Sequence, residues 1–155
     1  MSKSTFVYVT YIRTTPDKLW AALTTPEVMR EYWFGSMAES EWTAGSSWRL
    51  LFADGSLADS GEIVEAVPGK RLVIRWLNEW KPEIKAEGHS LCTMEIEPVA
   101  DVEVPAVKLS ITHEIERADS QFIGAVSGGW PRILSNLKSL LETGAILLNP
   151  VKAAG

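Results

Sequence analysis

The sequence has 155 residues, of which 46% are hydrophobic and 23% charged, and its formal net charge is −5 at pH 7. This length and composition are typical of a globular domain with a buried core, and they exclude disordered and collagen-like chains. The acidic balance and the lack of a basic cluster argue against a nucleic-acid partner. We therefore expect a single domain over residues 1–155, with its core at about 6–142 and a short tail at 145–155.

The cysteine and tryptophan counts bear on location and function, because the sequence contains one Cys and seven Trp. One cysteine cannot form an internal disulfide, and the N-terminal residues do not form an apolar leader, so we expect a cytoplasmic protein. No segment approaches the length of a membrane span. Tryptophan side chains can line a cavity as well as fill a core, and both roles are open here.

The N-terminal part predicts a strand followed by two short helices. Residues 6–13 are rich in β-branched and aromatic side chains, with apolar residues in both alternating sets, which predicts a strand covered on both faces or over much of each. Thr15-Pro16-Asp17 then places a capping threonine, a proline at the first helical position and an acid in the first turn. Thr25-Pro26-Glu27 repeats this arrangement and predicts the second helix.

The middle of the chain predicts an antiparallel sheet. Apolar residues at every second position indicate strands over residues 37–42, 46–53, 57–67, 71–78, 90–98 and 107–116. The short links between them contain Gly, Pro and Asp, and the segment 81–88 is expected to be a turn. The alternation makes one face of the sheet polar and the other apolar, so the apolar face needs a cover.

A long C-terminal helix over residues 119–142 is expected to provide that cover. Its apolar residues recur at spacings of three and four, Asp119 or Ser120 can cap its start, and Gly144 can close its end. Gly128-Gly129-Trp130-Pro131 interrupts the pattern, which predicts a bend. We expect the glycine pair to let the helix approach the sheet closely.

This order of elements resembles the helix-grip arrangement of START-like proteins, the SRPBCC superfamily of the birch-pollen allergen and polyketide cyclases. Within it, the sequence resembles the activator-of-heat-shock-protein-90-ATPase-like branch. The motifs that carry the resemblance are the segments 16–27, Trp33-Phe34, 61–65, 71–76, 109–113 and Gly129-Trp130 with Leu134 and Leu137. The resemblance covers about residues 6–142.

The resemblance implies an α+β fold in which a curved antiparallel sheet of about seven strands and two short N-terminal helices wrap on the long C-terminal helix. It implies a cavity between that helix and the sheet, but no single activity, because relatives include lipid carriers, cyclases, resistance proteins and chaperone cofactors. The chaperone activator that names the branch has an additional N-terminal domain without a counterpart here. Co-chaperone activity is therefore not implied.

Motifs for catalysis or metal binding are few. Two distant histidines and one cysteine do not have the spacing of metal ligands, so we expect no metal and no cofactor. Cys92, at an inward position, is interpreted as a small hydrophobic residue. His113 shares the apolar face of its strand with Leu109 and Ile111. It either is a buried histidine satisfied by its surroundings, or it orients a ligand or transfers protons.

The leading hypothesis is a module that binds a small hydrophobic or aromatic molecule without covalent chemistry. The expected ligand-binding residues lie on the inward faces of the strands and the helix, and they are Trp33, Trp48, Leu50, Phe52, Ile74, Trp76, Met94, Leu109, Ile111, His113, Val126 and Trp130. Two alternatives stay open, a cyclase- or hydrolase-type enzyme using His113 as acid or base, and a chaperone-cofactor-like interaction domain. A homodimer is also open, because Ile146, Leu147 and Leu148 in the tail can either pack back or meet a partner chain.

Overall fold

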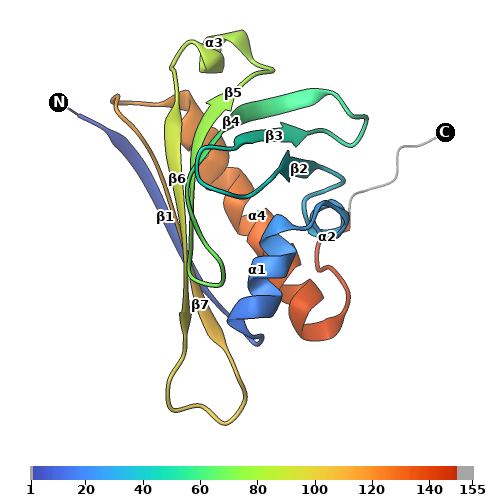
Figure 1. The fold of residues 1–155 in the computed structure, drawn as a ribbon. Coiled ribbons are helices and arrows are strands. Elements are labelled where there is room, and N and C mark those ends of the chain that lie inside the picture. Colours follow the sequence, from blue (N-terminus) through green and yellow to red (C-terminus); the bar gives the residue numbers. More distant parts are fainter. Residues whose placement is uncertain (1, 150–155) are drawn as a thin grey trace.

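The computed structural model describes residues 2–149 and has the expected α+β, helix-grip architecture. Its antiparallel sheet has the strand order β1-β7-β6-β5-β4-β3-β2, and the long helix α4 lies across it (Figure 1). The strands are β1 Ser4–Ile12, β2 Met37–Ser40, β3 Ser47–Leu51, β4 Leu57–Val67, β5 Arg71–Asn78, β6 Ser90–Pro98 and β7 Val107–Ile115. The helices are α1 Pro16–Thr24, α2 Pro26–Tyr32, α3 Pro82–Lys85 and α4 Gln121–Thr143.

Most expected elements are confirmed to within a few residues. The difference is α3, a four-residue helix in the segment that was expected to be a turn. Pro82 is its first residue, where the missing N–H of proline is not needed, and Ile84 is buried against the rest of the fold. Among residues 2–149, no helix is long and apolar enough to cross a membrane.

Both ends of α4 are closed by hydrogen bonds. The Ser120 hydroxyl accepts from the N–H of Ile123 at 3.1 Å, and Gly144, with φ of 85°, closes the C-terminal end. The carboxylate of Glu87, from the loop before β6, accepts from the Ser120 hydroxyl at 2.6 Å and from the N–H of Gln121 at 2.9 Å. Burial raises the pKa of Glu87, but these hydrogen bonds outweigh it and leave the pKa below its ordinary value.

The glycine pair of α4 does not have the role expected from the sequence. The helix continues through Pro131, and a Cβ added at Gly128 or Gly129 would meet no atom within 4 Å. The expectation that these glycines let the helix approach the sheet closely was therefore wrong, because the position of an added Cβ is open space. The close approach occurs at Gly61 of β4, where a Cβ would lie 1.7 Å from the carbonyl oxygen of Arg75 on β5.

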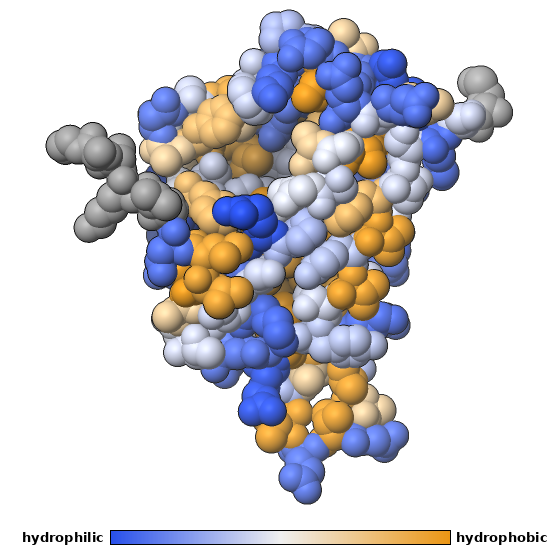
Figure 2. Space-filling model, turned by 180° about the vertical axis from the view of Figure 1, so that it is seen from behind, coloured by the Kyte–Doolittle hydropathy of each residue, from blue (hydrophilic) through white to orange (hydrophobic). Residues whose placement is uncertain are grey.

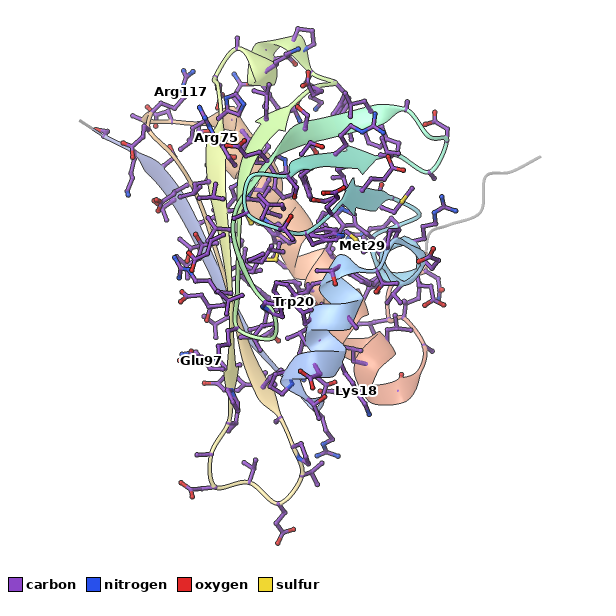
Figure 3. The ribbon with its side chains drawn as sticks, in the orientation of Figure 1. Lys18, Trp20, Met29, Arg75, Glu97 and Arg117 are labelled. Carbon is purple, nitrogen blue, oxygen red and sulfur yellow. The ribbon has the colours of Figure 1, made fainter. Side chains whose placement is uncertain are left out.

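The two faces of the sheet differ in cover. Helices α1, α2 and α4 lie on one side, whereas Arg75 and Glu97 lie on the other side and face solvent (Figure 3). The expectation that the first strand is covered on both faces was wrong, because Val7 is 58% and Tyr11 55% exposed on the uncovered side of β1. Apolar residues in both alternating sets therefore do not indicate that both faces of this edge strand are covered.

The C-terminal tail packs back on α4 as far as the structure describes it. The buried side chain of Asn136 accepts from the N–H groups of Leu147 and Leu148 and donates to the carbonyl oxygen of Leu148 at 3.1 Å. Ile146 packs against the core, whereas Leu147 is exposed. The rest of the tail, residues 150–155, lies outside the described residues.

The N-terminal closure of α4 predicts the effect of one substitution. Replacing Glu87 by Ala removes the acceptor for Ser120 and Gln121 at a helix N-terminus, which should lower the free energy of unfolding by about 1 kcal/mol. Urea denaturation measures this change. Glu83→Ala, at an exposed position of α3, is the control and should leave stability unchanged; equal stability of the two variants would contradict this account of the Glu87 contacts.

Candidate ligand-binding site

A cavity of about 300 Å³ lies between the N-terminal half of α4 and the end of the sheet next to α3. This volume is at the lower end of the range of small-molecule sites. From the side of α4, the surface is hollowed in its upper part, below α3 (Figure 2). The lining residues are mostly apolar, and they are Trp33, Ser36, Leu50, Phe52, Ala58, Asp59, Trp76, Asn78, Trp80, Lys81, Ile84, Phe122, Ala125, Val126, Gly129, Trp130 and Ile133.

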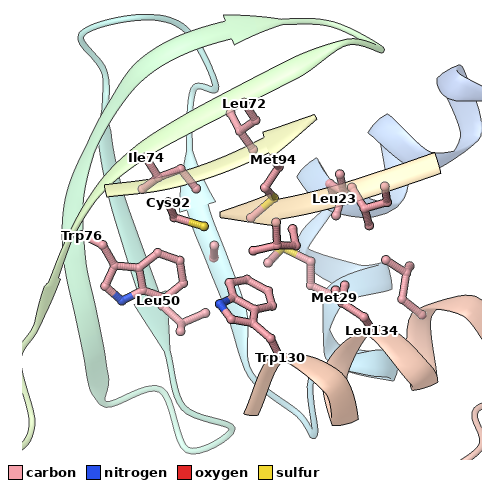
Figure 4. Packing of buried hydrophobic residues seen from close by; sticks show 14 of the residues in the cluster. Leu23, Met29, Leu50, Leu72, Ile74, Trp76, Cys92, Met94, Trp130 and Leu134 are labelled. Atoms are coloured by element: carbon pink, nitrogen blue, oxygen red, sulfur yellow. The ribbon is translucent and has the colours of Figure 1, made fainter. Parts of the chain in front are cut away.

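Three indole rings form one wall of this cavity. The ring of Trp33, just after α2, lies 5.3 Å from Trp130 of α4 and 6.5 Å from Trp76 of β5 between centroids. Trp76 and Trp130 face one another from the sheet and the helix at 6.0 Å (Figure 4). Phe52 and Trp80 make an edge-to-face pair at 5.5 Å elsewhere in the lining. The aromatic rings therefore come from the sheet, the helix and the loops together.

The structure brings half of the sequence-predicted binding residues to this cavity. Those that line it are Trp33, Leu50, Phe52, Trp76, Val126 and Trp130. Trp48, Ile74 and Met94 lie in the core beside Trp76, around a void of only about 10 Å³. Leu109, Ile111 and His113 of β7 are fully buried and do not line the larger cavity. Ligand contact by any of these residues stays a prediction.

His113 connects the helix to the sheet by hydrogen bonds at both ring nitrogens. Its Nδ1 accepts from the indole N–H of Trp130 at 3.1 Å, so in the neutral ring the proton is on Nε2. Nε2 then donates to the hydroxyl of Ser90 at 2.8 Å, and this hydroxyl donates to the carbonyl oxygen of Trp76 at 3.4 Å. Burial lowers the pKa of His113 to about 3, so the ring is neutral at pH 7. This environment matches a structural histidine.

Asp59 is the acidic residue of the cavity. It lies on β4 opposite Leu50 of β3, next to a break in the strand register, and only 7% of it is exposed. Burial raises the pKa of its carboxyl group to about 7; the neighbouring Trp76 and Asn78 side chains oppose this rise and the charge of Glu79 adds to it. Although Trp76 is a neighbour, Oδ1 of Asp59 and Nε1 of Trp76 are buried and lack a hydrogen-bond partner among the described residues.

Sequence analysis missed several lining residues, among them Asp59, Asn78, Trp80, Ile84 and Phe122. A signal existed for the two polar ones. Alternation along β4 places Asp59 on the same face as Ile63, and alternation along β5 places Asn78 with Trp76. A polar residue in an inward position is more informative than another apolar one. Ile84 and Phe122 reach the cavity through α3 and the start of α4, which alternation does not describe.

Other reactive groups do not form a second site in residues 2–149. Burial raises the pKa of the Cys92 thiol, so it is not a thiolate nucleophile at neutral pH. Among these residues, no cluster of three or more His, Cys, Asp or Glu side chains could hold a metal ion.

Comparison with known proteins identifies the family. The model of the family described as Activator of Hsp90 ATPase homolog 1-like protein matches residues 13–142. The chain belongs to this family. It has the START-like, SRPBCC fold that the resemblance implied. No curated protein matches the chain with significant similarity.

Solved structures of similar fold come from diverse organisms. A protein of Mesorhizobium loti is 24% identical, with a TM-score of 0.73, and the match covers 89% of this chain and 96% of that one. The Aha1 dimer of Colwellia psychrerythraea is 20% identical, with a TM-score of 0.69 and coverage of 91% and 98%. An Hsp90 activator of Plasmodium falciparum is 22% identical, with a TM-score of 0.68 and coverage of 88% and 95%. At these identities the likeness establishes the fold alone.

Asp59 and His113 predict an unusual pH dependence for this Hsp90-activator-like protein. The folded state binds more protons at Asp59 than the unfolded state between pH 4 and 7, so this group lowers stability as pH rises. For His113 the unfolded state binds more protons between pH 3 and 6.5, so this group lowers stability as pH falls. The two effects oppose one another near pH 5 to 6.5. Wild-type stability should therefore change little in this window.

A substitution at one of these two residues reveals the pH dependence of stability that the other one causes. In Asp59→Asn, stability should fall from pH 6.5 to pH 5, by at most about 1.4 kcal/mol per pH unit. In His113→Gln, stability should instead rise over the same interval. Urea denaturation at several pH values measures both slopes. A profile of Asp59→Asn parallel to that of the wild type would show that Asp59 does not titrate in this range.

Proposed function

We propose that this protein binds a small hydrophobic or aromatic molecule in the cavity between α4 and the sheet, without covalent chemistry. The observation that carries the proposal is the cavity itself, about 300 Å³ of space bounded by indole and aliphatic side chains. Space of this kind inside a small domain is normally filled by side chains, because protein interiors are close-packed. Gly129 contributes to the space, since it leaves room where any other residue would place a side chain.

The proposal predicts that apolar aromatic compounds quench tryptophan emission and raise the melting temperature. A ligand that binds only the folded state at a concentration of 100 times its dissociation constant stabilises it by about 2.7 kcal/mol. Three tryptophans of the cavity wall lie close enough to report occupancy. A screen of several hundred diverse compounds that gives neither response would contradict the proposal.

A matched pair of substitutions localises the binding site. Gly129→Leu should place a side chain in the cavity and abolish the response to the compounds found in the screen. Gly128→Leu, on the exposed side of the same helix, should keep it. Both variants should gain up to about 1 kcal/mol of stability, because leucine is a better helix former than glycine. Equal ligand response in the two variants would place the binding site elsewhere.

A cyclase- or hydrolase-type enzyme is the second candidate. One observation favours it, with a different residue as the acid or base. Asp59, rather than His113, lines the cavity, and a carboxyl group with pKa of about 7 suits a general acid or base near neutral pH. Proton transfer by Asp59 would require that Asp59→Asn lower turnover by about 10²–10⁴-fold. Binding alone would leave no turnover to lose.

Partners and location complete the proposal. The related structure of Colwellia psychrerythraea is described as a dimer, and β1 presents the exposed apolar residues Val7, Val9 and Tyr11 at an edge of the sheet, which supports a homodimer here. Analytical ultracentrifugation tests this state.

The related Plasmodium falciparum protein is described as an Hsp90 activator, so a chaperone-cofactor role is a third candidate. We place the protein in the cytoplasm, because its one cysteine, Cys92, is buried as a free thiol.

A further inference from the structure

The polar side chains that line the cavity differ in burial. Asp59 and Asn78 are only 7% and 8% exposed, so they belong to its buried part. Ser36 and Lys81 are half-buried and therefore lie closer to solvent. The side chains of Trp76 and Asn78 are hydrogen-bonding neighbours of the Asp59 carboxyl group, so this buried part is already engaged. A charged group on a ligand is therefore expected at the mouth of the cavity, where it keeps part of its hydration.

Lys81 is the cationic residue of the lining, and its ammonium group is unpaired. The group lies over the ring of Trp80, another lining residue, 4.7 Å from the ring centre. Within residues 2–149, Lys81 does not form an ion pair. Glu79, two residues earlier, pairs instead with Lys85 at 2.7 Å. The buried side-chain polar atoms that lack a partner in these residues do not include Nζ of Lys81, so this atom is accessible.

The backbone of Lys81 is held in place by the start of α3. Its N–H donates to the side-chain oxygen of Asn78 at 3.0 Å, and its carbonyl oxygen accepts from the N–H groups of Ile84 at 3.0 Å and Lys85 at 2.8 Å. Pro82 follows it, which favours its extended backbone. The flexible stem of the lysine can therefore turn toward a ligand while its backbone stays fixed.

A second cation lies near the cavity, on α4. Arg132 follows the lining residue Gly129 by three positions, so the two residues are neighbours on the helix surface. Its guanidinium carbon lies 5.7 Å from the centre of the Phe34 ring, next to the loop that brings Ser36 into the lining. In the described part of the chain, Arg132 also forms no ion pair. The chain as a whole carries a net charge of −5, so its charge at this cavity is opposite to its average.

We propose that the ligand is an apolar, aromatic carboxylate, with its ring system inside the cavity and its carboxylate group at the mouth, where the Lys81 ammonium donates to it. An uncharged ligand would leave this ammonium group without a counter-charge. A cationic ligand would be repelled by Lys81, which already lies over the Trp80 ring where such a ligand would otherwise bind. This inference rests on the proposed function, because it names the class of molecule that the same cavity takes.

Four probes on one bicyclic skeleton test the inference. Near neutral pH, 2-naphthoate is an anion, 2-naphthamide is its uncharged isostere, 2-naphthylmethylammonium is a cation, and naphthalene carries no polar group. We expect 2-naphthoate to bind about threefold to tenfold more tightly than 2-naphthamide, because a partly exposed ion pair contributes a factor of this order. The ammonium probe should bind more weakly than 2-naphthamide. Isothermal titration calorimetry gives the four dissociation constants.

Three substitutions assign the preference to one side chain. Lys81→Met removes the charge but keeps an apolar stem, so the preference for 2-naphthoate over 2-naphthamide should fall below about twofold, while naphthalene binds as before. Lys81→Glu should reverse the preference in favour of the ammonium probe. Lys18→Met removes the same charge from an exposed position of α1, away from α3, and as the control should keep the wild-type preference (Figure 3). Added salt should weaken the wild-type preference.

The outcomes separate this inference from the proposed function. If naphthalene binds but 2-naphthoate has no advantage over 2-naphthamide, the cavity takes apolar molecules and the carboxylate assignment is wrong. An equal loss of preference in Lys81→Met and Lys18→Met would also overturn it, because the preference would then come from the overall charge. If none of the four probes binds, the proposed function fails and the inference fails with it. Should Lys81→Glu not fold, Lys81→Met and the wild-type protein decide.

Discussion

The structure depends on one chain of hydrogen bonds that runs from the helix into the sheet. The Trp130 indole of α4 donates to His113 of β7, which donates to Ser90 of β6, whose hydroxyl donates to the backbone of β5 at Trp76. All of these groups are buried, so each bond forms where water cannot compete and where a missing partner would be costly. The bonds fix the height and rotation of α4 over the sheet. Apolar packing alone would specify the position of the helix less strictly.

The position of α4 also determines where the fold is filled and where it is open. On one side of Trp76, the core residues Trp48, Ile74 and Met94 leave only about 10 Å³ of empty space. On the other side, Gly129 and the short α3 leave a cavity of about 300 Å³. Trp76 and Trp130 therefore serve both regions, since each belongs to the buried core and to the wall of the cavity. A change at either residue should affect stability and binding together.

Membership of the Hsp90-activator-like family establishes the scaffold but not the activity, because this fold supports unrelated functions. The cavity of this chain has a buried carboxyl group in its lining, that of Asp59. Asp59 comes from a β4 strand whose register shifts beside it, so that Ala58 and Asp59 are both buried although they are consecutive. Asp59 faces inward with Ile63 by alternation, and the register shift turns Ala58 inward as well.

The sequence by itself determined the order and nearly all of the elements. Proline and threonine at 15–16 and 25–26 begin two helices, Ser120 and Gly144 bound the long one, and alternation defines the sheet, because these signals are local. It also identified inward residues such as Trp33, Trp76 and Trp130. Only the tertiary structure decided which inward residues meet the cavity and which meet one another. That choice depends on where α4 lies over a curved sheet and on register shifts in β4, and neither leaves a periodic signal in the sequence.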